Sequence, residues 1–319
     1  MKYFNPTQLK RIEAKKKQLN QYRPLSPALV KKLREELNLL MTYNSNAIEG
    51  NSLTLKETFL VIKEGLTVKG KPLKDHLETK NHYEAIDYLY SIIDKKNVIK
   101  PSEKLIKEIH YLITSDTLKR EAGKYRVTNV IISGSKHKPP LSTEISELMN
   151  KLILFWRKNE KKIHPIELAA LVHHQLVFIH PFTDGNGRVA RTIMNLILMQ
   201  KGYPLAVILK NDRKKYYQYL SLADKGNVAP FINFAASAVE RSLDMYLNII
   251  SSSKIEWQPL SVLAKKFHFT QKHLNFLSRT GKLDAHKEGR IWVSTEENIK
   301  SYLASRLRKI KIHNEKNTF

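Results

Sequence analysis

The chain contains no cysteine, and this absence excludes several kinds of chemistry. Disulfide bonds, zinc sites built on thiolates and thiol nucleophiles are all ruled out. The sequence also lacks an apolar run of the roughly 18 residues that a membrane-spanning helix needs, and its first residues form no signal-peptide pattern. These absences predict an intracellular, cytoplasmic protein with no membrane segment.

Acidic residues are scarce relative to basic ones, 30 against 55 in 319 residues, so the formal net charge is +25. Such an excess ordinarily suggests a nucleic-acid partner. Lysine, however, is spread through nearly every segment, as on a solvated surface with a compositional bias. We therefore expect diffuse positive charge, which also favours polyphosphate binding, more than a dedicated basic groove.

Glycine and proline are few, 11 and 12, and apolar residues recur with helical spacing along most of the chain. The body is therefore predicted to be all-α, with enough residues for a substantial core and one accessory domain. The predicted helices of the body are Pro6 to Gln21, Ser26 to Glu49, Thr54 to Glu64, Lys74 to Asp94, Ser102 to Ser115, Ser142 to Asn159, Pro165 to Ile179, Arg188 to Lys201, Arg213 to Lys225 and Val228 to Ser252.

The last part of the chain follows a serine-rich linker at Ser251 to Lys254. Two short helices, Pro259 to Phe267 and Thr270 to Thr280, precede a hairpin over Lys282 to Ser294, and a closing helix follows. This order resembles a winged helix-turn-helix. Basic residues outnumber acidic ones about twofold there, as phosphate-backbone contact requires. DNA binding is one reading, and docking or dimerisation with protein is the other.

The most informative segment runs from His180 to Arg191. It follows an apolar helical stretch, and its Asp-Gly-Asn-Gly cluster breaks the helix before a second helix begins. Residues 185–187 should therefore lie at a helix N-terminus, where free backbone N–H groups and the helix dipole bind anions. Arg188 and Arg191 are three residues apart and share a helix face.

The other side chains of this segment fit phosphate chemistry too. The carboxylate of Asp184 is the kind of oxygen ligand that Mg²⁺ accepts when phosphates complete its shell. The imidazole of His180, with an ordinary pKa of about 6.5, suits removal of a hydroxyl proton. An ordinary capped turn is the alternative for a short glycine pattern, but it does not account for all twelve residues.

These residues resemble the signature of the Fic family, whose members mostly transfer AMP from ATP to a protein hydroxyl. The pattern His-x-Phe-x-Asp-Gly-Asn-Gly-Arg-x-x-Arg is matched at every specified position, and a phosphate-transferring branch has lysine where this chain has Gly187. The resemblance implies that His180 is the general base and Asp184 the Mg²⁺ ligand. It places Arg188 and Arg191 on the β and γ phosphates of ATP. The implied anion-binding residues are Gly185, Asn186 and Gly187.

Two further segments resemble parts of the same family. The β-branched run near residue 130 is similar to the flap, a short β-hairpin that pairs with the backbone of the target. The flap residues are Val130, Ile131, Ile132, Ser133 and Gly134. Residues 213–220 resemble the helix that contacts adenosine, which makes Tyr216 and Tyr217 nucleotide-binding candidates or, alternatively, core aromatics. Asp224 stands where relatives often have asparagine, so its nucleotide contact is an open question.

An upstream segment resembles the inhibitory motif of the family. Ser45 and Glu49 lie four residues apart on one helix face, and Gly50 suits the end of that helix. The resemblance, which extends over Leu33 to Tyr90, implies that Glu49 pairs with Arg191 and so keeps ATP from a productive position. A helix end with a solvated glutamate is the plain alternative.

We therefore predict a protein adenylyltransferase that needs ATP and Mg²⁺ and acts on a hydroxyl side chain of a protein. Its parts are an N-terminal helical region (1–100), a Fic-type core (101–252) and a winged-helix-like domain (255–319). Another nucleotide donor, removal of AMP, or a DNA-binding regulator with a nucleotide-sensing domain are the alternatives. A homodimer is also compatible with the sequence.

Overall fold

The computed structural model describes residues 3–95, 99–132, 134–135, 137–253, 257–296, 298–303 and 305. The chain forms two compact units, Met1–Leu247 and Asn248–Phe319, which we call the first and second unit. Each is described by itself. The predicted linker residues Ser251 to Ser253 form the end of a helix, Ala229–Ser253, that begins in the first unit and ends in the second, and Lys254 lies outside the described residues.

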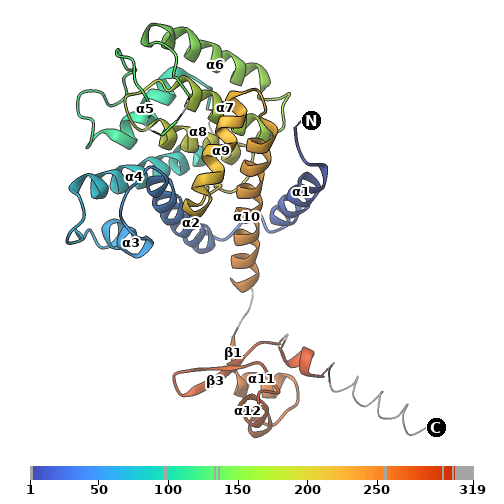
Figure 1. Cartoon of the computed structure of the whole chain (residues 1–319). Coiled ribbons are helices and arrows are strands. Elements are labelled where there is room, and N and C mark those ends of the chain that lie inside the picture. The colour runs from blue at the N-terminus through green and yellow to red at the C-terminus, as the bar shows by residue number, and fades with distance from the viewer. Residues whose placement is uncertain are drawn as a thin grey trace. The chain divides into compact units, whose positions relative to one another are not determined.

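The described part of the first unit is built from helices, which confirms the predicted all-α body (Figure 1). None of these helices is long and apolar enough to cross a bilayer. In chain order they are α1 (Pro6–Gln21), α2 (Pro27–Ile48), α3 (Leu55–Lys63), α4 (Leu73–Asp94), α5 (Glu103–Thr114), the 3-10 turn η1 (Ser142–Glu144), α6 (Ile145–Asn159), α7 (Pro165–Ile179), α8 (Asn186–Gln200), the 3-10 turn η2 (Lys210–Asp212), α9 (Arg213–Asp224) and α10 (Ala229–Ser253).

Local signals in the sequence determine where these helices begin and end. Thr54 and Glu57 form a capping box at the start of α3, as predicted, since each side chain bonds the backbone N–H of the other. Pro165 occupies the first turn of α7, where its missing N–H costs no hydrogen bond. Gly202 follows α8 with a φ of 77°, a conformation that favours glycine.

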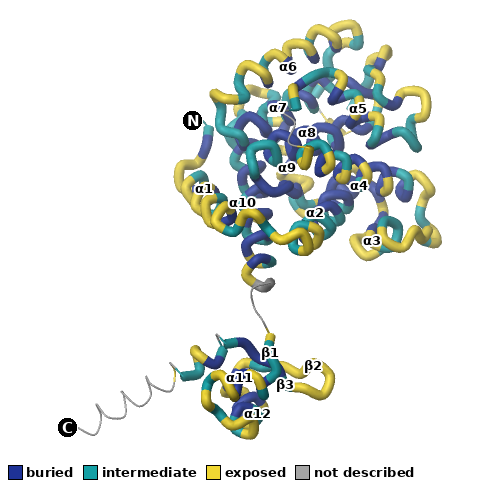
Figure 2. Tube along the Cα trace, turned by 180° about the vertical axis from the view of Figure 1, so that it is seen from behind, coloured by how far each residue is buried: buried dark blue, intermediate teal, exposed yellow. Residues whose placement is uncertain are grey.

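Helices α7 and α8 form the centre of the first unit, and the other helices surround them (Figure 2). Leu168, Val172 and Leu176 of α7 are completely buried, and so are Ile193 and Leu196 of α8. Burial of each such side chain contributes about 1.5 to 3 kcal/mol. The turn between these two helices, which contains the Asp-Gly-Asn-Gly cluster, is therefore held between two buried helices.

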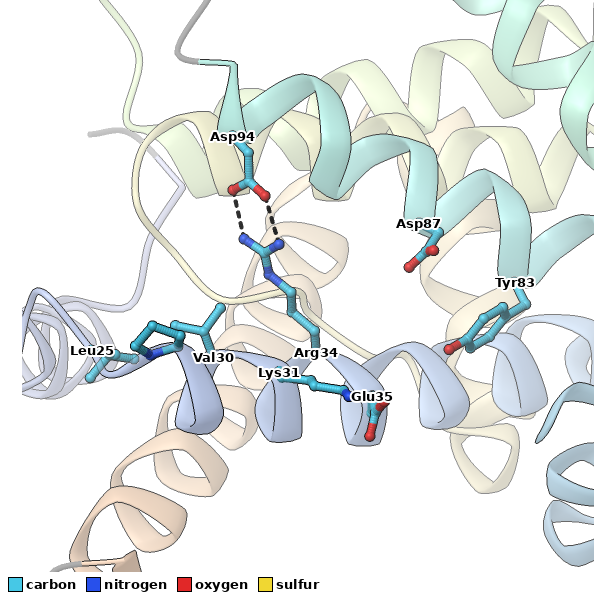
Figure 3. A pocket seen from close by; sticks show the side chains of 9 residues that line it. Leu25, Val30, Lys31, Arg34, Glu35, Tyr83, Asp87 and Asp94 are labelled. Atoms are coloured by element: carbon cyan, nitrogen blue, oxygen red, sulfur yellow. Dashed lines mark hydrogen bonds and ion pairs between the residues drawn. The ribbon is translucent and has the colours of Figure 1, made fainter.

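Helix α2 lies along α4 and is bonded to it at several levels. Asn38 donates to the carbonyl of Tyr83 over 3.2 Å. Further toward the start of α2, Arg34 makes a bidentate ion pair with Asp94, both bonds being 2.6 Å, across a surface pocket of about 530 Å³ (Figure 3). These contacts fix the direction of α2 relative to α4 along its length.

The second unit contains the two short helices and the hairpin that the sequence predicted. Helices α11 (Leu260–Lys266) and α12 (Gln271–Arg279) pack on a three-stranded antiparallel sheet of order β1-β3-β2. Its core is apolar and includes Leu260, Leu263, Leu274, Leu277 and Ile299. The strands are β1 (Gln258–Pro259), β2 (His286–Glu288) and β3 (Ile291–Ser294). The winged-helix assignment and the domain boundaries stay predictions.

The predicted flap differs from expectation in one respect. Its described residues form no β-strand, although Ser135 N–H bonds the Ile132 carbonyl and closes a turn with Gly134 at a φ of 74°. Ser133 lies outside the described residues. A β-branched run needs a partner strand for its ladder bonds, and no described neighbour supplies one. The hairpin prediction was therefore wrong about strand pairing within the described residues.

Candidate active site

The turn between α7 and α8 is held by its own side chains. His180 ends α7 in the left-handed conformation with φ of 51°, and Gly185 adopts φ of 80° before α8. Asn186 closes the turn, because its amide accepts from Phe182 N–H at 2.9 Å and donates to the Phe182 carbonyl at 2.8 Å. The N–H groups at the start of α8 are thus presented on a fixed loop, as an anion-binding site requires.

His180 is oriented by its neighbours and is uncharged at neutral pH. Its Nδ1 lies 3.4 Å from the Val177 carbonyl, an acceptor, so Nδ1 carries the proton and Nε2 is left as a base. The backbone is held by Arg126, whose Nε donates to the His180 carbonyl at 2.9 Å. Burial lowers the pKa of His180 to about 4. The imidazole is therefore available as a proton acceptor.

The carboxylate of Asp184 is half-buried at the edge of the same turn. One oxygen accepts from the Gly185 N–H at 2.6 Å, and the other lies 3.6 Å from Lys74 Nζ. Burial by itself would raise the pKa of Asp184, but Arg188, the Gly185 N–H and Lys74 together outweigh it and lower the pKa. The group is thus an anion with an accessible oxygen.

Arg188 is buried and has unused hydrogen-bond donors. Its side chain is 1% exposed, and its ionic contacts are Glu78 at 3.1 Å and Asp184 at 3.4 Å. The Glu78 contact lacks hydrogen-bond geometry, and neither Nε nor Nη1 of Arg188 has a hydrogen-bond partner. A buried unpaired donor costs about 1 to 3 kcal/mol, more when it is charged. This arrangement fits an anionic ligand that accepts these bonds.

Arg191 is equally buried, but its donors are paired. Ser45 accepts from Nε through its hydroxyl and from Nη2 through its carbonyl, both at 2.9 Å. Glu49 Oε1 accepts from Nη2 at 2.8 Å. Burial by itself would lower the pKa of Arg191, but Glu49 and the nearby tyrosines Tyr216 and Tyr217 outweigh it and raise the pKa. The structure thus brings Ser45, Glu49 and Arg191 together.

Glu49 reaches Arg191 because α2 ends next to the turn. Glu49 is the C-cap of α2, and Gly50 continues with a φ of 102°, so the predicted helix end is confirmed. The carboxylate also lies against Gly187, where an added Cβ would clash with Glu49 Oε1. The carboxylate therefore lies against both the glycine turn and the second arginine of the motif.

The two tyrosines of α9 have different surroundings. Tyr216 is 1% exposed, and its hydroxyl contacts Arg191 at 3.4 Å and His173 at 3.1 Å. Its hydroxyl therefore contacts Arg191, and because the ring is buried, no ring face is open for stacking on a nucleotide base. Tyr217 is 39% exposed, and its hydroxyl donates to Glu49 Oε2 at 3.4 Å. Tyr217 is thus the member of the pair with a surface that a ligand can reach.

Asp224, at the end of α9, is paired with a histidine. Its Oδ1 lies 2.9 Å from His174 Nε2. A carboxylate at this position accepts hydrogen bonds but cannot donate one, unlike the side-chain amide of an asparagine. His173, on the adjacent position of α7, points to Tyr216 instead, so the two histidines do not form a pair.

The flap segment projects from a rigid base. The guanidinium of Arg126, almost fully buried, donates to the carbonyls of Thr128 at 2.8 Å and Pro140 at 2.7 Å, which joins the two ends of the loop. Ile131, between these ends, is 95% exposed, while Val130 and Ile132 are partly buried. An exposed apolar side chain on a segment outside any helix or strand is suited to contact with another chain.

Three residues of the site were not among the predicted ones. Glu78 contacts Arg188, and Arg126 anchors the flap. His110 stacks on Phe182 with ring centroids 3.7 Å apart, and its Nε2 lies 3.1 Å from the Asp184 carbonyl. They come from distant helices or loops, and no spacing in the sequence links them to residues 180–191.

Asp184 is the sole candidate metal ligand in the part of the site that the structure describes. Among the described residues, no three metal-ligating side chains of histidine, aspartate or glutamate gather in one place. A protein cage for a metal ion is therefore not formed here. A single carboxylate fits an ion such as Mg²⁺ only if a ligand's phosphates and water complete the shell.

The buried histidines predict a loss of stability in mild acid. Burial lowers the pKa of His110 and His180 to about 4, and lowers those of His82 and His173 well below the ordinary range. Between about pH 6.5 and pH 4 the unfolded chain binds more protons, so the free energy of unfolding falls as the pH is lowered through this window. We expect about 2 kcal/mol from each of His110 and His180 between pH 7 and pH 5.

Urea unfolding at a series of pH values measures this loss. His173→Gln removes one buried titrating group, so its unfolding free energy should change less with pH. An unfolding free energy that stays constant from pH 7 to pH 5 would contradict the prediction.

Comparison with known proteins points to a single family. Residues 100–198 match the Fic/DOC family model. The chain is 38% identical over 248 residues to a protein named "Protein adenylyltransferase Fic" from Nematostella vectensis, which covers 77% of this chain and 57% of that protein. A protein of the same name from Culex quinquefasciatus is 34% identical over 77% of this chain and 49% of its own length. The chain thus spans about half the length of the curated relatives it matches.

Solved structures show the same fold. A Fic domain containing signaling protein from Bacteroides thetaiotaomicron superposes with a TM-score of 0.69 at 29% identity, covering 77% of this chain and 97% of that one. A single-substitution variant of a Fic-1 fragment from C. elegans gives a TM-score of 0.67 at 30% identity, covering 76% of this chain and 72% of that one.

Proposed function

Since the chain belongs to the Fic/DOC family, we propose that it is a protein adenylyltransferase, which transfers AMP from ATP to a hydroxyl side chain of a protein. The observation that carries this proposal is the buried Arg188 at the start of α8, with two donor nitrogens that have no hydrogen-bond partner. They lie beside a glycine turn at a helix N-terminus, and together these groups suit the phosphates of a nucleotide.

The residues have distinct roles in this reaction. Nε2 of His180 accepts the proton of the target hydroxyl while the hydroxyl oxygen attacks the α-phosphorus of ATP. The new bond joins this oxygen to AMP, the bond to the β-phosphate breaks, and pyrophosphate leaves. Arg188 and Arg191 hold the departing phosphates, so positioning and charge neutralisation supply most of the rate.

Mg²⁺, when bound, would neutralise phosphate charge, and Asp184 is the residue placed to hold it. Asp184→Asn keeps the size of the side chain and removes its charge. We expect this change to lower the transfer rate by roughly 100-fold and to raise the Mg²⁺ concentration needed for half-maximal rate.

Asp116→Asn is the matched control for this experiment. Asp116 is 41% exposed against 43% for Asp184, and each carboxylate lies within 4 Å of a lysine. The control should keep the parent rate and Mg²⁺ dependence. Equal Mg²⁺ dependence in Asp184→Asn and the parent protein would remove Asp184 from the metal site.

We further propose that Glu49 inhibits the transfer. A carboxylate on Arg191, pressed against Gly187, competes with the terminal phosphate of ATP for the same donors. Nucleotide that binds while Glu49 is in place would lack this contact and lie in a poor position for attack. Ser45 keeps Arg191 in place in either case, because it bonds Nε and Nη2 independently of Glu49.

The position of the label in ATP tests the proposed transfer. The protein is incubated with Mg²⁺ and ATP labelled on either the α- or the γ-phosphate, and modified protein is weighed by mass spectrometry. AMP transfer gives a mass increase of one AMP and retention of the α-label alone. Retention of the γ-label would show phosphate transfer, and competition by other nucleotides would reveal another donor.

The partner of the second unit stays a prediction. Exposed basic residues on α12 and the β2-β3 turn, such as Lys272, Arg279 and Arg290, favour an acidic partner such as DNA. Phe276, exposed on the same helix, favours a protein. A homodimer and a cytoplasmic location likewise stay predictions.

A further inference from the structure

The first turns of α4 lie beside the motif arginines, and Glu78 in this region has no role in the reaction proposed above. Glu78 is buried, and its two oxygens face different parts of the site. Oε1 lies 3.1 Å from Arg188 Nη1, and Oε2 accepts from Asn51 Nδ2 at 3.2 Å. One side chain thus contacts both the motif helix α8 and the segment that follows α2.

The Glu78 side chain lies against the Arg188 guanidinium without consuming its donors. Because this contact lacks hydrogen-bond geometry, Nε and Nη1 of Arg188 remain free for a phosphate. Of the residues described, one other carboxylate, Asp184, pairs with Arg188, at 3.4 Å. If Asp184 holds Mg²⁺ during the reaction, Glu78 is the carboxylate that stays with Arg188.

The contact with Asn51 belongs to a set of bonds that fasten the segment after Glu49 to α4. Asn51 also donates to the Asp75 carbonyl at 3.0 Å. Ser52 donates to the Asp75 carboxylate twice, from its N–H at 2.7 Å and its hydroxyl at 2.6 Å. The backbone two and three residues beyond Glu49 is therefore held, so the position of Glu49 depends on α4.

We propose that Glu78 is a positioning residue shared by both halves of the phosphate site. It holds Arg188 where the nucleotide needs it, and through Asn51 it holds the helix end that keeps Glu49 on Arg191. Glu78 then pairs with Arg188, Glu49 pairs with Arg191, and Asn51 connects the two pairs. The inference rests on the proposed function for the identity of the ligand, ATP.

Nucleotide binding tests the first half of this proposal. Glu78→Asp keeps the charge but withdraws the carboxylate by one methylene, whereas Glu78→Gln keeps the position and loses the charge. We expect ATP, measured by calorimetry with the full chain, to bind about tenfold more weakly to the aspartate variant and within about threefold of the parent to the glutamine variant. Glu84→Asp, at an exposed position on the same helix, is the matched control and should bind like the parent.

Charge alone would produce the opposite order, with the aspartate variant normal and the glutamine variant weak. That order, or equal affinities in both variants, would overturn the positioning role. Both variants retain the residue volume within one methylene, and thermal unfolding of each confirms folding before the titration.

A double-mutant cycle tests the link through Asn51. Asn51→Ala should raise AMP transfer about fivefold in the parent protein, because Glu49 is held less firmly, and should change nothing in a Glu49→Gly background. The same fold-change in both backgrounds would show that Asn51 acts independently of Glu49 and would overturn the link. If Glu49→Gly protein transfers no AMP at all, the proposed function fails, while the ATP titrations still decide the role of Glu78.

Discussion

Replacing Glu49 with glycine should raise the rate of AMP transfer by at least about tenfold. The carboxylate pairs with Arg191 at 2.8 Å; the arginine side chain is 1% exposed and the glutamate side chain 33%, so water screens the pair only in part. Without Glu49, the same donors are free for the terminal phosphate of ATP. Glycine is tolerated there because α2 has already ended at Ile48. Incorporation of α-labelled ATP into protein measures the effect.

The chain contains a matched control for this substitution. Glu64 is the C-cap of α3 and is followed by Gly65 with a φ of 65°, so it repeats the local geometry of Glu49 and Gly50. Glu64→Gly should leave the transfer rate unchanged. A Glu49→Gly rate equal to that of the parent, with a modifiable protein present, would refute the inhibitory role of Glu49.

Removing His180 should have the opposite and larger effect. In the Glu49→Gly background, His180→Ala is expected to lower AMP transfer by at least about 100-fold. Because burial lowers its pKa to about 4, the imidazole is neutral at pH 7, and its Nε2 is ready to accept the hydroxyl proton. The affinity for ATP should change little, because the arginines and the glycine turn make the contacts with the phosphates. Transfer and ATP binding are measured on the same protein.

The left-handed backbone at His180 requires its own control. His268 has a φ of 57° and, apart from His180, is the non-glycine residue with positive φ among those described. His268→Ala introduces the same backbone cost outside the site and should leave transfer unchanged. His180→Asn suits the left-handed conformation better than alanine does, and it should be equally inactive. Activity retained in His180→Asn would show that the imidazole is not the base.

The helices were predicted closely from the sequence because their signals are local. The bounds of α1 and α7 agree with the prediction, those of α4 differ by one residue at its start, and those of α3 and α5 differ by one residue at each end. Caps, prolines and the spacing of apolar residues act within one or two turns of a helix. The prediction of a flap hairpin was wrong because its signal is not local. Strand pairing depends on a partner that the segment itself does not contain.

The residues of the candidate site likewise divide into those that the sequence predicts and those that only packing brings in. Residues 180–191 are consecutive, so their chemistry was readable before the fold, and the structure places them on one turn between two buried helices. Glu78, Arg126 and His110 could not be predicted, because α4, the flap base and α5 reach the turn only after packing. Tyr216 was a nucleotide candidate by sequence, and its burial under Arg191 became visible only in three dimensions.

The sequence alone therefore determined the helical body, the motif turn and the kind of ligand it suits, since each depends on groups within a few residues of one another. The tertiary structure decided which partners the two arginines have. Glu49 lies 142 residues from Arg191 along the chain, yet their side chains meet at 2.8 Å. Arg188 contacts Glu78 and has donors without a hydrogen-bond partner, whereas Arg191 is hydrogen-bonded to Ser45 and Glu49. Such long-range contacts follow from helix packing, which no local spacing encodes.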